Sequence, residues 1–304
     1  MKKPSIHLLI VLLSIISVNS FGQGFYFRAG LGYAFAQAGQ TIDGTGQPYN
    51  GTLNNATQAT SIKSASFSAG LQGQLGFGYM VSEHVGVQLD ANAGLSNKKY
   101  TLNVSNVTLG SGVPGSVSFV QHANSPLMLM PSIVVQSGGA PWNIYTRFGV
   151  AIPLNTQITY DEIQTNDPNT GALTVDDFTF KIKNSFSLGF AGAAGVQYKV
   201  NDRVSIFGEL SLLSMSVYIK QKQMTKFTEN GQSYPLSMVG GSPQTVNYSK
   251  NTTVDSAGAN QAAYSQPFSN VGFNVGITIT MGSRRHSEPA DRPGSSRPRS
   301  SKFR

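Results

Sequence analysis

The sequence contains no cysteine, so it can form neither a disulfide bond nor a lipid-anchored N-terminal cysteine. Charged residues make up only 12% of the chain. An ordinary soluble domain carries about 25%, so a water-soluble globule of this composition would lack about half of its solubilising surface. Glycine, by contrast, occurs 33 times. Membrane β-barrels explain both features, because their outer wall is uncharged and their narrow interior accommodates small residues.

Long apolar runs are missing after the N-terminus, so the body of the chain offers no candidate for a membrane helix. The N-terminus has two lysines, an apolar stretch over about 6–18 and small residues behind it. This order predicts a secretory signal peptide over residues 1–22, cleaved between Ser20 and Gln23. A buried hydrophobic helix is the alternative, and we disfavour it because nothing caps the run and strand pattern follows at once.

Positive charge is concentrated at the two ends of the chain. The formal net charge is +8, of which two charges come from Lys2 and Lys3 and five from residues 282–304. The segment between them is therefore nearly neutral, and no nucleic-acid partner is expected. Because residues 282–304 are dominated by Arg, Ser and Pro, they predict a disordered, basic periplasmic tail.

Histidine is rare, so the sequence offers few candidates for a catalytic base. Three of the four histidines fall in the signal peptide, a predicted turn and the tail. His122 remains, near Asn124 and Ser125, but its spacing does not match the His-x-Ser arrangement of lipid A deacylases. No His and carboxylate grouping indicates a metal site. We therefore predict that the protein is not an enzyme and has no metal or cofactor.

Eight segments alternate apolar with small or polar residues, the pattern of a strand with one face in hydrocarbon. The last of them, Val271 to Met281, alternates without a break over a length that crosses a bilayer at a tilt. The eight segments lie at about 24–36, 65–81, 85–96, 126–136, 142–154, 184–200, 204–219 and 271–281.

The connections between these segments alternate strictly between short and long. Turns of a few residues occur at 82–84, 137–141 and 201–203, and long polar stretches at about 37–64, 97–125, 155–183 and 220–267. This is the wiring of a bacterial outer-membrane barrel, with short turns in the periplasm and long loops outside. Residues 23–281 thus predict an all-β fold: a transmembrane eight-stranded antiparallel up-and-down β-barrel with four long extracellular loops and short periplasmic turns.

Four charged residues occupy inward positions of alternate strands at similar heights. They are Arg28, Asp90, Arg147 and Glu209, and their signs alternate around the ring. Because an isolated charge in a narrow lumen is very costly, we predict an ion-pair network. The alternative is separate solvation by lumen water. Further polar side chains are expected to fill the lumen: Gln72, Gln74, Gln88, Asn92, Tyr145 and Gln197.

Two features describe the outward surface. Aromatic residues gather at strand ends and predict two interfacial girdles, in which Phe67 and Phe268 belong to the outer one. The apolar phase slips at Leu213, after which Met215, Val217 and Ile219 carry it, so a β-bulge near Leu213 is predicted.

Eight lysines lie near the predicted outer rim, where the leaflet carries phosphorylated glycolipid. They are Lys63, Lys98, Lys99, Lys181, Lys183, Lys220, Lys222 and Lys226. Ammonium groups at this height attract lipopolysaccharide. Ordinary solvated loop charges are an equally good interpretation, and the sequence leaves the two open.

The signal peptide, the eight alternating segments, the Gly-rich lumen positions and the terminal strand over Gly276–Met281 resemble one family. This is the outer-membrane β-barrel domain family widespread in Bacteroidetes, which is similar in architecture to the transmembrane part of OmpA and to OmpX. The resemblance implies a cell outer membrane location and insertion by the barrel-assembly machinery. It carries no catalytic motif.

Two functions remain open at this stage. An eight-stranded barrel encloses space only for side chains or one small ligand, which makes a wide channel unexpected. We therefore expect a structural or surface-interaction role, in which the extracellular loops bind an external protein or glycan. The alternative is a narrow porin or a barrel that binds or transports a small, possibly hydrophobic solute.

Overall fold

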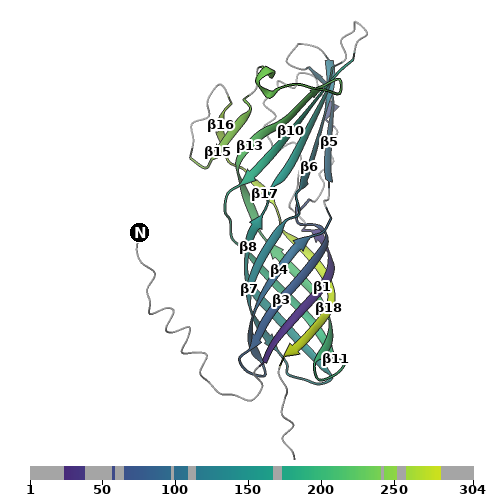
Figure 1. Ribbon diagram of the computed structural model, residues 1–304, viewed down its shortest axis with the longest axis vertical. Coiled ribbons are helices and arrows are strands. Elements are labelled where there is room, and N and C mark those ends of the chain that lie inside the picture. Colours follow the sequence, from purple (N-terminus) through teal and green to yellow (C-terminus); the bar gives the residue numbers. More distant parts are fainter. Residues whose placement is uncertain are drawn as a thin grey trace, which may run out of the picture.

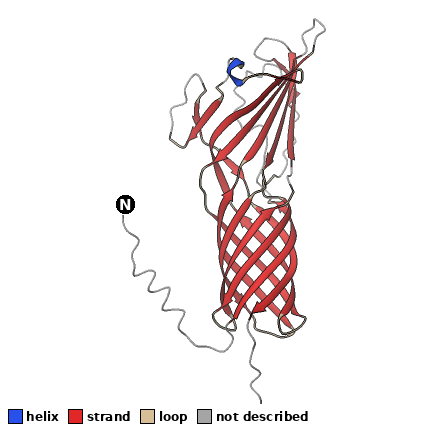
Figure 2. Cartoon of the chain, in the orientation of Figure 1, coloured by secondary structure: helices blue, strands red, loops and turns tan. Residues whose placement is uncertain are grey.

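The computed structural model describes residues 24–37, 57–58, 65–96, 99–108, 114–166, 173–240, 243–251 and 258–281. The predicted signal peptide and the predicted tail lie outside these residues. The described part is nearly all β-structure with one short 3-10 helix, η2 (Figure 2). It contains no helix with the length and hydropathy needed to span a membrane.

Eight antiparallel strands close into a barrel in the order β1-β18-β12-β11-β8-β7-β4-β3 (Figure 1). Their bounds are β1 Gly24–Ala36, β3 Gly70–Met80, β4 Val85–Gly94, β7 Leu127–Gln136, β8 Trp142–Asn155, β11 Gly189–Lys199, β12 Val204–Ser214 and β18 Asn270–Met281. Each strand pairs with the next barrel strand along the chain, and β18 closes the ring on β1. The prediction of an eight-stranded antiparallel up-and-down barrel is confirmed.

A second sheet stands above the outer mouth of the barrel, and we call it the extracellular sheet (Figure 1). Its strand order is β16-β15-β13-β10-β9-β6-β5-β2. The bounds are β2 Thr57–Gln58, β5 Lys99–Thr108, β6 Pro114–Ala123, β9 Ile158–Asn166, β10 Thr174–Asn184, β13 Ser216–Glu229, β15 Thr245–Ser249 and β16 Asn260–Ala262. Strands β14 Gln232–Ser233 and β17 Ser265–Pro267 pair with β13, and η2 spans Leu236–Met238.

The long extracellular connections are therefore more ordered than the sequence analysis expected. Hairpins β5–β6 and β9–β10 come from two of them and pair with each other through β6 and β9. Alternation of β-branched and aromatic residues, as in Phe178, Phe180 and Ile182, was the available signal. A polar composition obscured it.

The predicted bulge at Leu213 is wrong. Strands β11 and β12 pair in continuous register through the pairs Ala191–Leu213 and Phe190–Ser214. Met215 lies between β12 and β13, where its carbonyl accepts a hydrogen bond from the Phe268 amide (3.2 Å). The side chains of Met215 and Val217 are buried instead of facing lipid. Side chains therefore continue to alternate between the two sides of the wall without a bulge. The inward residues become apolar because the lumen becomes apolar towards its outer mouth.

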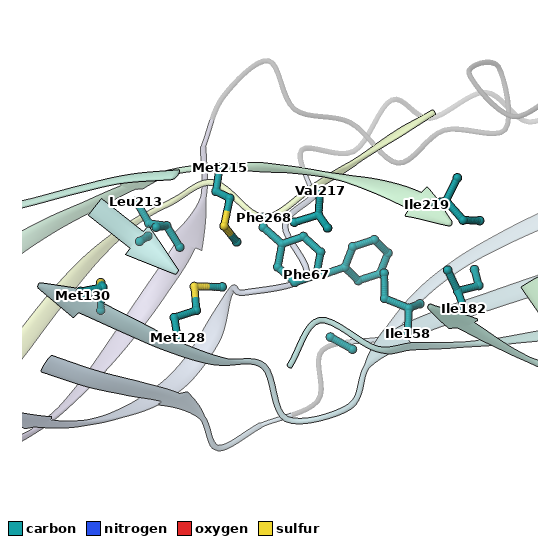
Figure 3. Packing of buried hydrophobic residues seen from close by; sticks show 12 residues of the cluster. Phe67, Met128, Met130, Ile158, Ile182, Leu213, Met215, Val217, Ile219 and Phe268 are labelled. Carbon is teal, nitrogen blue, oxygen red and sulfur yellow. The ribbon is translucent and has the colours of Figure 1, made fainter. Parts of the chain in front are cut away.

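The buried apolar core sits at the barrel mouth, where the barrel meets the extracellular sheet (Figure 3). We call it the neck cluster; its members are Phe67, Ala123, Met128, Met130, Ala151, Ile158, Ile182, Leu213, Met215, Val217, Ile219 and Phe268. Phe67 and Phe268 were predicted to lie in the outer girdle, and both are buried here. Their backbone amides donate to Pro267 (2.9 Å) and Met215 (3.2 Å), which holds the two rings over the lumen.

Candidate functional site

The barrel lumen below the neck cluster contains the four predicted charged residues. Arg28 lies on β1, Asp90 on β4, Arg147 on β8 and Glu209 on β12, all on the inward face of their strands. One further strand separates each from the next around the ring, so each charged residue has residues of opposite charge as its neighbours on both sides. Asp90 is 0% and Glu209 1% exposed, which leaves no room for separate solvation by bulk water.

Three of the four neighbouring pairs are ion pairs. Arg147 donates from Nη1 to Asp90 Oδ2 (2.5 Å) and from Nη2 to Glu209 Oε1 (2.6 Å), so it bridges both acids. Arg28 Nη2 lies 3.0 Å from Glu209 Oε2. Two cations therefore neutralise two anions. Charge balance of this kind is what a buried ionic group requires to be tolerated. We call these four residues the lumen network.

Polar side chains supply further hydrogen bonds to both carboxylates of the lumen network. Asp90 Oδ1 accepts from Gln74 Nε2 (3.1 Å) and from Gln88 Nε2 (2.6 Å). The Tyr145 hydroxyl accepts from Arg28 Nη2 (2.7 Å) and donates to Glu209 Oε2 (2.8 Å). Satisfied partners on both carboxylates fix their positions and remove the cost of unpaired buried oxygens.

The remaining predicted lumen residues lie above and below this level. Asn92 Nδ2 donates to Gln72 Oε1 (3.1 Å), on the side towards the neck cluster. Gln197 is half-buried near the periplasmic end, opposite Asn143 on β8. Asn274, which the sequence analysis did not single out, donates to Glu209 Oε1 (3.2 Å). Asn274 occupies an inward position in the alternation of β18, and this is the sequence feature that could have identified it.

Glycines on the intervening strands make space for the lumen network. A Cβ added at Gly76 of β3 would stand 2.4 Å from Asp90 Oδ1. At Gly195 of β11 it would stand 2.6 Å from the Tyr145 hydroxyl oxygen. The ionic side chains occupy the volume that side chains on these two strands would otherwise fill.

The outer mouth of the lumen is filled by the apolar neck cluster. The rings of Phe67 and Phe268 have centroids 5.7 Å apart, and Phe268 is completely buried. A cavity of about 30 Å³ lies between this level and the lumen network, lined by residues that include Gln72, Met130 and Arg147. Such a volume accommodates water but no larger solute. Side chains thus fill the lumen at two successive levels, one ionic and one apolar.

The extracellular sheet carries a connected row of aromatic rings on one face. Neighbouring ring centroids lie 5.9 Å apart for Phe119–Tyr160, 5.7 Å for Tyr160–Phe180, 6.4 Å for Phe180–Phe178 and 4.9 Å for Phe178–Phe227. We call these five residues the aromatic row. Ile158 and Ile182 of the neck cluster share this face, one ladder step nearer the barrel. The apolar surface is therefore continuous from the barrel mouth into the sheet.

The predicted rim lysines separate into three groups. Lys63 and Lys98 lie outside the described residues. Lys99, Lys181, Lys183 and Lys220 are exposed, as is Lys226, whose Nζ lies 3.8 Å from Asp177 Oδ2. Lys222 departs from the prediction, because it is half-buried with its ammonium group over the rings of Tyr160 and Phe180. It is therefore not placed to contact glycolipid at the rim.

His122 lies within the extracellular sheet, where its ladder neighbours are Lys99 and Thr159. The nearby Asn124 amide donates to Thr159 Oγ1 (3.0 Å). Across the described ranges, no three His, Asp or Glu side chains gather closely enough to hold a metal ion.

The outer wall of the barrel is apolar and exposed all the way round. Examples at mid-height are Leu75, Leu89, Ile144 and Leu210, each about half exposed or more. At the periplasmic end the rings of Trp142 and Tyr198 have centroids 4.7 Å apart and form part of an aromatic girdle. An exposed belt of this size is stable only in hydrocarbon, and a closed barrel satisfies its backbone there. The chain is an integral β-barrel protein of the cell outer membrane.

The sequence matches no protein-family model and no curated protein. Among solved structures, it is similar to the outer membrane protein OprG from Pseudomonas aeruginosa, with 14% identity over 88% of this chain and 100% of that chain and a TM-score of 0.41. A major outer membrane protein from Thermus thermophilus has 11% identity over 85% and 99% and a TM-score of 0.35. The outer membrane protein AlkL, solved in DMPC bilayers, has 14% identity over 90% and 97% and a TM-score of 0.34. Likenesses at this level do not transfer a function.

Proposed function

We propose that this protein is a closed membrane anchor that presents the extracellular sheet for interaction with a partner outside the cell, such as a protein or a glycan. The observation that carries this proposal is the filling of the lumen at two levels. The four buried side chains of the lumen network meet inside the lumen, and the neck cluster lies above them. The sheet of long strands above the mouth then provides a surface for recognition.

Passage or binding of a small solute is the second candidate. It is favoured by the apolar side chains at the mouth of the lumen, among them Met128 and Met215. Methionines adapt their shape readily to an apolar ligand. Transport would require the lumen network to separate, at the cost of unpaired charges.

Three further expectations belong to the same proposal. The protein has no catalytic role, its exposed lysines at the sheet base contact lipopolysaccharide, and the barrel-assembly machinery inserts it. We also propose that the protein belongs to the outer-membrane β-barrel family of Bacteroidetes, which is similar to OmpA.

Planar bilayer recording distinguishes the two candidate functions. The folded full-length protein is expected to pass no steady current. The variant Arg147→Ala/Glu209→Ala, which removes the central ion pair, serves as the leaky reference. A steady current through the unaltered protein would overturn the anchor and favour the solute channel. Cells that display the protein should in addition bind a glycan or protein surface, and should lose this binding when the β5–β6 and β9–β10 hairpins are shortened.

A further inference from the structure

Lys222 occupies an unusual position for a lysine of an extracellular sheet. It lies on β13 opposite Ile182 of β10, near the base of the sheet. Its side chain turns to the face of the aromatic row, and Nζ stands 4.1 Å from the ring centroid of Tyr160 and 3.9 Å from that of Phe180. Two ring faces thus hold the ammonium group in place by cation–π attraction.

Lys222 forms no ion pair with any acid in the described part of the chain. Other lysines do, as Lys226 with Asp177 (3.8 Å) and Lys199 with Asp202 (2.8 Å) show. The acid that acts on Lys222 is Glu162 of β9, but its carboxylate accepts from Gln164 Nε2 (2.8 Å) and from the Tyr160 hydroxyl (3.4 Å). The ammonium group therefore has aromatic neighbours and no carboxylate of its own.

Burial lowers the pKa of Lys222 to about 8, and the charge of Glu162 opposes this shift only in part. The other titratable groups around it are tyrosines. Burial raises the pKa of Tyr160 well above its ordinary value, and that of Tyr248 on β15 to about 12. The hydroxyl of Tyr264 faces the same region. Tyr160 and Tyr248 are neutral near pH 8, so Lys222 is the group of this set that titrates there.

The surroundings of Lys222 are apolar on both sides. Towards the barrel lie Ile182 and Ile219 of the neck cluster, and outwards the aromatic row continues through Phe180 and Phe178. A single cation embedded in apolar surface is the complement of a molecule with one anionic head and an apolar body. A carboxylate would give the ammonium group the charged hydrogen-bond partner that the protein does not supply.

We propose that the extracellular sheet binds a small amphiphilic carboxylate, with the carboxylate on Lys222 and an aryl or alkyl body along the rings of Tyr160, Phe180 and Phe178. This site lies on one face of the sheet that is proposed to bind a partner, and it does not depend on whether the lumen conducts. Recognition combines one charge-assisted contact with burial of apolar area, so both parts of the ligand contribute to affinity.

The test compares 4-phenylbutyrate with the uncharged 4-phenylbutanol, using saturation-transfer NMR on the full-length protein in nanodiscs. The unaltered protein should bind the carboxylate at least about tenfold more tightly than the alcohol. In Lys222→Met, which keeps the length of the side chain but not its charge, the carboxylate should lose this advantage while binding of the alcohol is unchanged. Lys226→Met is the matched control on the same strand and should behave like the unaltered protein.

A pH series on the unaltered protein tests the site without any substitution. The carboxylate of the probe stays ionised from pH 6 to 10, so only the lysine changes charge. Since the anion binds the protonated amine, its affinity should be constant below about pH 7.5 and fall by about tenfold per pH unit above pH 8. Equal affinity of Lys222→Met and the unaltered protein for 4-phenylbutyrate, or affinity without this pH dependence, would overturn the site.

Discussion

Leu212 and Leu213 are adjacent in the chain and lie on opposite sides of the barrel wall. Leu212 is 47% exposed on the lipid-facing surface, and Leu213 is 7% exposed inside the lumen. If every apolar residue is assumed to face lipid, two successive leucines can both face it only if the strand slips in register. The strand keeps its register, because the mouth of this lumen is itself apolar and accommodates Leu213 beside Met130 and Met215.

Single-cysteine labelling tests this arrangement, and the absence of cysteine from the chain removes any background. We expect Leu212→Cys to react with a maleimide when the folded protein is held in detergent micelles at mildly alkaline pH, because its side chain lies on the outer surface near the end of β12, where the thiolate can form. Leu213→Cys should be protected, since its side chain packs in the neck cluster. Comparable reaction rates for the two variants would contradict the inward placement of Leu213.

Removal of one charge from the lumen network should strongly destabilise the barrel. Asp90→Asn leaves Arg147 with one acidic partner and is expected to cost about 3–5 kcal/mol, because a buried charge loses its compensation. Asp90→Lys, which adds a third cation, should cost more. Urea titration followed by the gel shift of the folded barrel measures both.

Asp202→Asn provides the control for these variants. Asp202 pairs with Lys199 in an exposed periplasmic turn, where solvent screens the charges, so the change should stay below about 1 kcal/mol. Similar effects of Asp90→Asn and Asp202→Asn would mean that the lumen network is solvated after all.

Truncation of the neck aromatics should open a cavity at the barrel mouth. Phe268→Ala is expected to cost about 3–5 kcal/mol, because Phe268 is fully buried between Phe67 and Met215. Phe268→Leu retains most of the volume and should cost less than about 2 kcal/mol. Unfolding midpoints of the two variants measure this order. A Phe268→Ala barrel as stable as the Leu variant would show that Phe268 does not close the mouth.

Asp176 and Glu229 are like charges directly opposite each other on β10 and β13. Partial burial, and then the charge of Glu229, raise the pKa of Asp176 above its ordinary value. Since the folded state prefers the protonated acid, the ionised form weakens the sheet above this pKa. Asp176→Asn should therefore stabilise the β10–β13 pair by a few tenths of a kcal/mol, about the size of one cross-strand pair, at neutral pH.

Amide hydrogen exchange across β10 and β13 measures this gain. It should shrink as the pH falls and Asp176 becomes protonated in the unaltered protein. A gain that stays constant down to acidic pH would assign the effect to something other than the carboxylate charge.

The periodicity of two along the strands could be predicted from the sequence, and with it the lumen positions of Arg28, Asp90, Arg147 and Glu209. Parity is a local property: successive side chains alternate sides wherever the chain is extended. The spacing of short and long connections gave the antiparallel order as well. The alternation shows which side chains point into the lumen, but it does not show which of them contact one another there. The ion pairs of Arg147 depend on how the ring of strands closes.

By itself, then, the sequence determined a closed barrel with an apolar outer wall and charged residues inside. The reason is that every side chain facing hydrocarbon has to be apolar, whatever strand it belongs to. Only the tertiary structure decided that Phe67 and Phe268, which are far apart in the chain, meet over the lumen, and that Lys222 lies among aromatic rings. Such contacts join segments remote in sequence. Their geometry is set by strand register and ring closure together, and no local pattern of residues specifies either.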